Sequence, residues 1–450
     1  MKLIRSLAAM AAVGAVALAG GCAQPSSSSQ PDAQYSSTVD QKAGKAATTL
    51  ELWTFVELHG KFYETMAGHW NEQHPDKQVK LHINVMPYDD MHNKLQLALT
   101  SGSGVPDLVD IELGKFPNFT KGTPALEDLT SYADPYKADL VKARLDLYSK
   151  DSKIYGFDFH VGTTLAFYNT ELLDAAGIDY TTIKTWDDFK DAGAKYHQGT
   201  GKDFGTTDTS AMWQSNLLLG QLGGDYLDSA GNVTVDSPQV KQAFAILKGI
   251  QDAGAASVPP GGQPDTEEAY GAINKGDYAA MIMPEWFMSR FTAYMPDLKG
   301  KIAIAPAPVV DGAKVKTVGG GGTGTAVPAA GKNKALAAEF IAYAKLSKDG
   351  NEEIWKTLGF DPMNTSMWKD DSITKDPSNQ YVQYFKTNPF DSLNAVSDSI
   401  GLLTSATSPN APSVGNLFTT ETLNNMFESG TPVDDALAQA ESDLKNELGQ

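Results

Sequence analysis

The 450-residue sequence contains one cysteine, Cys22, so no disulfide can form within the chain. It also lacks an excess of positive charge: the formal net charge is -19 at pH 7. An acidic surface repels phosphate backbones, which argues against a nucleic-acid partner. There are no charge runs and no internal repeats, and no segment after the first 21 residues is apolar for long enough to span a bilayer.

What is present is the material for a large core. Hydrophobic residues make up 41% of the chain, with 18 Phe, 17 Tyr and 7 Trp. This composition excludes global disorder. At ~150 residues per domain, the length predicts two or three domains or one large two-lobed body.

The N-terminus has the pattern of an export signal. Lys2 and Arg5 precede an apolar run at 7–18. The run falls within the ~7–15 residues of a signal-peptide core and is shorter than the ~20 needed for a membrane span. The small residues 19–21 then lead to Cys22, and residues 23–48 are rich in Ser, Gln and Ala.

A sole cysteine at this place resembles the signal of bacterial lipoproteins, although Ala19 stands where that family usually has Leu. The resemblance implies a signal peptide at 1–21, a lipid on Cys22 and a flexible tether at 22–48. Two acyl chains would hold the protein on the outer face of the cell membrane. The alternative is an ordinary cleaved signal with an incidental cysteine.

Strand and helix patterns alternate from residue 49 onward. Segments 50–55 and 79–85 alternate apolar and polar residues, and 106–111 is a short apolar strand. Helical spacing lies between them at 62–74 and 91–99. This order predicts an α/β fold with a mostly parallel sheet covered by helices.

Several short motifs occur in an order that resembles the extracellular solute-binding proteins of ABC importers, specifically the sugar-binding group of the maltose-binding type. They are Leu52-Trp53-Thr54-Phe55, Gly104-Val105-Pro106-Asp107, Tyr155-Gly156, Phe167-Tyr168-Asn169, Ala176-Gly177-Ile178-Asp179, Thr185-Trp186-Asp187-Asp188-Phe189 and Gly276-Asp277-Tyr278 through Trp286. The N-terminal part, including 88–92 and 109–112, is similar to the arabino-oligosaccharide binders within this group.

The resemblance implies a two-lobed periplasmic-binding-protein fold of type II, with the ligand in a cleft that closes by hinge motion. We expect an N-lobe at 49–160 with about 305–347, and a C-lobe at 161–304 with about 348–450. The chain would then cross between the lobes near 158–162, 304–306 and 347–350. The implied function is a monomeric, non-catalytic receptor that captures an oligosaccharide and delivers it to permease subunits, with no cofactor.

A sugar presents apolar C–H faces and a rim of hydroxyls, so its site needs flat rings and hydrogen-bonding groups. In parallel-sheet proteins such groups lie in loops beyond the strand ends. We expect Glu57 and His59 to contribute from a loop at 55–61, and Glu112 from the end of the third strand. The alternative for the loop residues is a solvated surface.

Further candidates come later in the chain. His160 lies at the first expected crossing, and Trp213 and Trp286 are candidate stacking rings, with core packing as the alternative. The family uses the tryptophan at the second of these positions as a platform. Glu285 is a candidate hydroxyl acceptor, and Arg290, one helical turn later, could support Glu285 or donate to the ligand.

The glycine run at 319–322 does not match a phosphate loop, because no lysine and hydroxyl follow it. Gly320 and Gly321 are instead expected to let the backbone approach a bound sugar closely.

Two other functions remain open. Five histidines lie in the segment from His59 to His92, which makes a metal-binding receptor an alternative function. However, His69 and His74 are five positions apart and do not share a helical face. We therefore predict no metal site. A tethered glycoside hydrolase would need two carboxylates ~5–9 Å apart across a cleft, and Glu57, Glu112 and Glu285 supply candidates.

Overall fold

The computed structural model describes residues 35–37 and 39–450. The predicted signal peptide at 1–21, Cys22 and the first part of the predicted tether lie outside the described residues. Residues Gln34–Gln450 form one compact unit. Within the described chain, no helix combines the length and the apolar character needed to cross a membrane.

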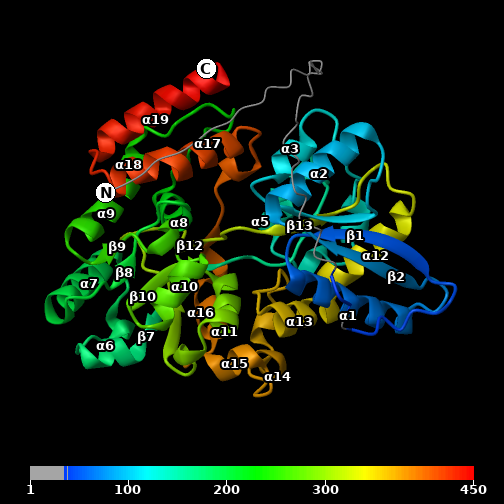
Figure 1. The fold of residues 1–450 in the computed structure, drawn as a ribbon, viewed down its shortest axis with the longest axis horizontal. Helices are drawn as coiled ribbons and strands as arrows, with labels where there is room; N and C mark the ends of the chain where they lie inside the picture. Colours follow the sequence, from blue (N-terminus) through cyan, green and yellow to red (C-terminus); the bar gives the residue numbers. More distant parts are fainter. Residues whose placement is uncertain (1–34, 38) are drawn as a thin grey trace, which may run out of the picture. The chain divides into compact units, whose positions relative to one another are not determined.

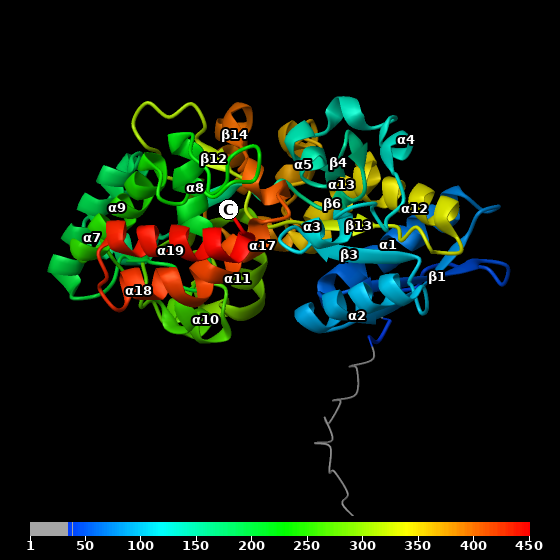
Figure 2. The ribbon, with the colours of Figure 1, turned by 90° about the horizontal axis from the view of Figure 1, so that it is seen from above.

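A five-stranded sheet forms the first structural layer (Figure 1). Its order is β2-β1-β3-β13-β6, with bounds Val79–Val85, Thr48–Thr54, Leu108–Glu112, Thr323–Ala326 and Phe157–Asp158. β1 pairs in parallel with β2 and β3, whereas β13 is antiparallel to β3 and β6. The helices packed around this sheet are α1 (Glu57–Gln73), α2 (Tyr88–Ser101) and α12 (Lys334–Leu346) (Figure 2).

Helix α1 follows the apolar spacing read from the sequence. Phe62, Met66 and Trp70 are all buried on one face of it. The helix begins earlier than predicted, however, because the expected loop at 55–61 forms its first turn from Glu57 onward. The sequence does not reveal this earlier start, because the N-cap residue is Val56, whose side chain cannot accept a capping hydrogen bond.

The second sheet has three strands in the order β10-β7-β11, with bounds Ala280–Pro284, Thr164–Asn169 and Ile302–Pro306. Both of its pairings are antiparallel. The α/β class is therefore confirmed, and the expected parallel pairing holds for β1, β2 and β3, from which it was drawn, but not for β13, β6 or the second sheet. The physical reason is the chain path: β10 and β11 flank β7 after long excursions and run against it, and β13 returns to the first sheet against its neighbours.

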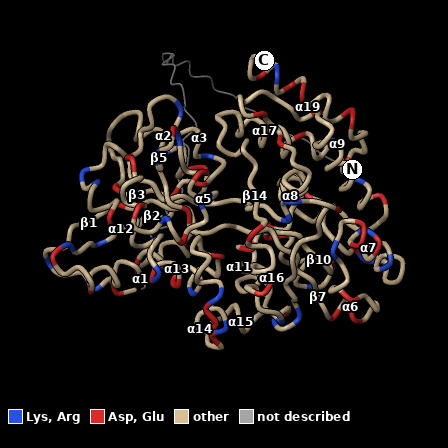
Figure 3. Tube along the Cα trace, turned by 180° about the vertical axis from the view of Figure 1, so that it is seen from behind, with Lys and Arg blue, Asp and Glu red and all other residues tan. Residues whose placement is uncertain are grey.

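Three long helices belong to the part of the chain that contains the second sheet, and the first of them starts at a side-chain cap. α7 (Trp186–Thr200) carries a capping box between Thr185 and Asp188. α9 (Pro238–Asp252) has proline in its first turn, and α19 (Val433–Leu448) packs against α9. Acidic and basic residues are interspersed along the chain trace (Figure 3), in line with the absence of charge runs.

The chain passes between the two sheets at three places. Residues 159–163 join β6 to β7, and the glycine run at 319–322 joins β12 (Thr317–Val318), which contacts β7, to β13. The expected passage at 304–306 is wrong, because β11 still pairs with β7 there.

The third passage also comes later than expected. Residues 347–350 lie at the start of α13 (Lys348–Glu353), and α13 still packs on α1, as does the helical turn at Ile354–Leu358. The chain reaches the second sheet at Lys386, whose N–H donates to the carbonyl of Ile302 in β11 at 2.8 Å, just before α16 (Pro389–Val396) packs on the same strand. The third passage therefore begins after Gly359 (φ 70), where the helical turn ends, and not at the end of α12.

Candidate functional site

The three passages are hydrogen-bonded to one another around the glycine run. The Gly320 N–H donates to the carbonyl of Gly162 at 2.8 Å. The carbonyl of Gly320 accepts from the Trp286 indole Nε1 at 2.9 Å. Val161 N donates to the carbonyl of Asp361 at 3.0 Å. This junction therefore brings together segments that are up to 200 residues apart in the sequence.

Trp213 and Trp286 meet edge to face beside the glycine run. Their ring centroids are 5.4 Å apart and the planes are inclined at 74°. Trp213 is the first residue of α8 (Trp213–Leu222) and its Nε1 donates to Gln263 at 3.0 Å. Trp286 follows β10 in the short helix η4 (Glu285–Phe287) and is 8% exposed.

The glycines are required by this close approach. A Cβ on Gly320 would lie 2.5 Å from Cγ of Pro284 and 3.3 Å from the Trp213 ring. Gly321 has a φ of +69°, and a Cβ there would lie 3.4 Å from Nε1 of Trp286. The backbone of the run thus packs directly against both rings, as a glycine-specific conformation allows.

Two guanidinium groups flank the rings. Arg290, in α11 (Met288–Tyr294), lies 5.2 Å over the Trp286 ring, and its Nε donates to Asp265 at 2.9 Å. It therefore does not support Glu285, one of the two roles expected for it. Arg144 forms a buried ion pair with Asp158 and donates to the carbonyl of Gly321 at 2.8 Å.

Glu285 and His160 lie together beneath the tryptophans, with Asp361 as a third member. Glu285 is fully buried, and its Oε2 accepts from the Asp361 backbone N–H at 2.9 Å. Burial and the neighbouring Asp361 carboxylate raise the pKa of Glu285 well above its ordinary value. The Asp361 carboxylate in turn accepts from the backbone N–H groups of Gly162 and Thr163 at 2.8 and 2.9 Å.

His59 is buried inside α1 rather than placed in a loop. Its Nδ1 lies 3.1 Å from Oδ2 of Asp110, which also accepts from Thr54, while Oδ1 accepts from Tyr63. Burial lowers the pKa of His59 below its ordinary value, against the opposing effect of Asp110. Lys345 is also fully buried here, and burial holds its pKa well below the usual range.

The two remaining predicted residues lie apart from the tryptophans. Glu57 is exposed at the start of α1, with Lys61 at 3.6 Å. Glu112 ends β3, where it pairs with Thr323 of β13 and accepts from Tyr88 at 3.0 Å and from the Gly114 N–H at 2.6 Å. Burial raises the pKa of Glu112.

The structure thus brings together six of the predicted positions: His160, Trp213, Glu285, Trp286, Gly320 and Gly321. Reading the sequence missed Arg144, Asp361, Lys345 and Asp208. One usable signal existed: beyond the N-terminal segment the sequence has only two arginines, Arg144 and Arg290. Both lie against this junction.

Asp208 is buried close to the start of α8. Neither carboxylate oxygen has a partner with hydrogen-bond geometry, although the N–H groups of Trp213 and Gln214 are near enough to favour the charged form. Burial outweighs them and raises the pKa of Asp208 to about 7.

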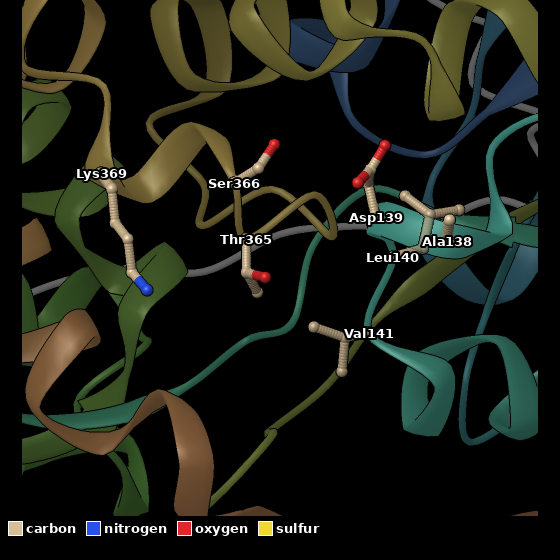
Figure 4. A pocket seen from close by; sticks show the side chains of 7 residues that line it. All are labelled: Ala138, Asp139, Leu140, Val141, Thr365, Ser366 and Lys369. Atoms are coloured by element: carbon tan, nitrogen blue, oxygen red, sulfur yellow. The ribbon is translucent and has the colours of Figure 1, made fainter.

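A separate hollow of about 380 Å³ is lined by Ala138, Asp139, Leu140, Val141, Thr365, Ser366 and Lys369 (Figure 4). A backbone bridge pairs Leu140, one of the lining residues, with Asn364. None of the residues predicted for sugar binding lines this hollow.

Comparison with known proteins gives concordant results. Residues 11–350 match the model of a family described as bacterial extracellular solute-binding protein. The chain is 39% identical to an arabinooligosaccharide-binding protein of Halalkalibacterium halodurans, over 90% of this chain and 91% of the relative. It is 40% identical to an arabinooligosaccharide-binding protein of Bacillus subtilis, over 81% and 84%.

Solved structures support the same fold. The ABC-transporter-associated binding protein of B. animalis subsp. lactis, in complex with β-1,6-galactobiose, has a TM-score of 0.73 at 20% identity, covering 89% of this chain and 97% of that one. An ABC substrate-binding protein from Listeria monocytogenes, in complex with cycloalternan, has a TM-score of 0.72 at 19% identity, covering 90% and 99%.

Proposed function

The chain belongs to the family of bacterial extracellular solute-binding proteins, and we propose that its solute is an arabino-oligosaccharide that it delivers to the permease of an ABC importer. Membership in this family places the chain among non-catalytic receptors, not among glycoside hydrolases. The sugar class is proposed because two relatives at 39% and 40% identity are named arabinooligosaccharide-binding proteins.

The observation that carries the proposal is the meeting of Trp213 and Trp286 beside Gly320 and Gly321. Trp213 is half-buried and can offer a flat apolar face to the C–H surface of a sugar, and the Trp286 ring, which is buried in the present arrangement, would do so once the surrounding segments open. The bare backbone of the glycines allows a ligand to approach closely. Gln263, bonded to Trp213, adds an amide beside the rings that can pair with hydroxyls.

We propose that His160 and Glu285 act at the inner side of this site and Glu112 at its edge. Glu285 Oε1 has no partner within the described chain, so it can pair with a hydroxyl. A buried polar group that finds its partner only on the correct ligand discriminates strongly between sugars. His59 contributes indirectly, because Asp110 already holds its Nδ1. Glu57 would contribute from the exposed start of α1.

We propose that the five-stranded and three-stranded sheets are the cores of two lobes that close over the sugar. The three passages at 159–163, 319–322 and beyond 358 would serve as the hinge. Closure allows the permease to distinguish loaded from empty receptor, since the ligand binds the closed state better. The receptor acts as a monomer, tethered outside the cell by a lipid on Cys22.

The proposal is tested by a thermal-shift screen of the mature protein, followed by calorimetry. Arabino-oligosaccharides are compared with xylo-, malto-, fructo- and galacto-oligosaccharides of equal length. A ligand at 100 times its dissociation constant stabilises the folded state by ~2.7 kcal/mol. We expect a clear shift with the arabinose series. A larger shift with another series would overturn the sugar assignment, and no shift with any sugar would overturn oligosaccharide binding.

A further inference from the structure

His160, Glu285 and Asp361 form a cluster of donor atoms that the proposed sugar site does not require as a set. One donor atom from each residue lies within 4.8 Å of the other two. They are 4%, 0% and 0% exposed. Each comes from a different part of the chain: the first passage, the end of β10 and the third passage.

Part of the hydrogen-bonding capacity of this cluster is unused. Oε1 of Glu285 and Nδ1 of His160 have no hydrogen-bond partner among the described residues, and neither has the neighbouring Thr163 hydroxyl. Nδ1 of His160 lies 3.5 Å from Oδ1 of Asp361, too far for a good hydrogen bond. Unpaired buried polar atoms are costly, so native structures rarely leave several of them together.

The cations nearby are committed to other carboxylates. Arg144 pairs with Asp158, and Arg290 pairs with Asp265. Lys345 interacts with Asp110 and Asp158. Among the described residues, His160 is therefore the basic residue that faces the carboxyl groups of the cluster, through its ion pair with Asp361.

We propose that His160, Glu285 and Asp361 bind a divalent first-row metal cation, for which Zn²⁺ is the best match. One imidazole nitrogen and two carboxylate oxygens form a mixed N/O ligand set typical of Zn²⁺, whereas Ca²⁺ requires six to eight oxygens. Tetrahedral bonds of ~2.1 Å place ligand atoms ~3.4 Å apart, so the cluster would contract from its present spacing, which is within 4.8 Å, when it takes up the ion. The Thr163 hydroxyl is available as a further donor.

The position of the cluster indicates a structural ion rather than a transported one. The cation would join residue 160 of the first passage to residue 361 of the third, beside the Trp286 platform. No spacing motif in the sequence points to this set, because its members are separated by 125 and 76 positions. The proposal is independent of which sugar the protein binds.

The test uses the full mature chain after treatment with a chelator. Zn²⁺ is titrated by calorimetry, the bound ions are counted by native mass spectrometry, and unfolding is followed by heating. We expect one ion per chain and a higher unfolding temperature with Zn²⁺, with little response to Ca²⁺ or Mg²⁺. Sugar affinity is not the readout, so a failure here leaves the receptor function untouched.

Two variants and one control locate the ion. Glu285→Gln keeps an oxygen that can accept from the Asp361 N–H, so the fold should persist, and His160→Ala removes the nitrogen ligand. We expect each to weaken Zn²⁺ binding at least tenfold. His82→Ala is the control, because His82 is exposed and pairs with Glu51 at 2.7 Å. Wild-type protein that binds no Zn²⁺, or loss of binding in the control alone, would overturn the proposal, as would unchanged affinity in both variants.

Discussion

At the scale of single residues, Trp286 is held on several sides. Arg290 lies over its face, Trp213 meets it edge to face, and its Nε1 is bonded to Gly320. This setting fixes the ring and leaves it buried in the present arrangement, with 8% of its surface exposed. A ring that is already rigid suits a stacking role because little side-chain freedom is lost when a ligand binds.

The Trp286→Ala variant should bind its sugar at least ~1 kcal/mol more weakly, which corresponds to about a fivefold rise in the dissociation constant. Calorimetry measures the affinity, and circular dichroism checks that the variant is folded. Tyr294→Ala is a matched control, because Tyr294 is a 56% exposed aromatic at the end of the same segment. Equal effects of the two substitutions would contradict a special role for Trp286.

Asp208 should make the free energy of unfolding of the protein decrease as the pH rises from about 4 to about 7. Its pKa is about 7 in the folded protein and ordinary, near 3.8, when unfolded. The folded state therefore binds more protons between these values, so the contribution of Asp208 is fully present below pH ~4 and is lost as the pH rises to ~7.

The Asp208→Asn variant should remove this dependence. Relative to the wild type, its free energy of unfolding should improve between pH 5 and pH 8 by on the order of 1–3 kcal/mol. Denaturant unfolding at both pH values measures the difference. A pH profile unchanged from that of the wild type would show that Asp208 is ionised in the folded protein.

Some site residues were readable from the sequence and others were not. Trp213, Trp286 and Glu285 stand out because aromatic and acidic residues follow turns or strands there. Asp361 and Lys345 do not, because a buried charge is defined by partners distant in sequence. His59 shows the limit of local reading: its type was noticed, but its partner Asp110 lies 51 residues away.

At the scale of elements, the glycine run at 319–322 is a tightly packed connection between β12 and β13. Its neighbours leave no space for side chains at Gly320, where an added Cβ meets Pro284. By contrast, Gly249 in the middle of α9 has nothing within 4 Å of an added Cβ. The two positions therefore predict opposite outcomes for the same substitution.

Gly320→Ala should destabilise the protein by about 1–3 kcal/mol through overpacking and should weaken sugar binding. Gly249→Ala, the control, should stabilise it by about 0.5–1 kcal/mol, because alanine is the better helix former. Denaturant unfolding measures both values. A Gly320→Ala variant with an unchanged free energy of unfolding would show that the glycine run and Pro284 can move apart at little cost.

Element types were predicted better than their ends and directions. Periodicity identified β1, β2 and α1. Strand direction in the second sheet was not predictable, because β10 and β11 are separated from β7 by more than a hundred residues and local patterns carry no information about orientation.

At the scale of the whole molecule, the proposed lobe closure makes a measurable prediction. Saturating ligand should reduce the radius of gyration in small-angle scattering, because hinge closure brings the two sheets closer together. Trp286→Ala under the same sugar concentration should show a smaller decrease, since less of the protein is loaded. An identical scattering curve with and without ligand, at proven saturation, would argue against closure.

The position of β13 has a consequence for how the protein is made. This strand lies inside the first sheet, between β3 and β6, yet it is the last of the five strands to be synthesised, after a gap of some 160 residues. Until residue 326 has left the ribosome, β3 and β6 have no bridge between them. The first sheet thus stays incomplete through more than two-thirds of translation, so we expect it to form late in synthesis.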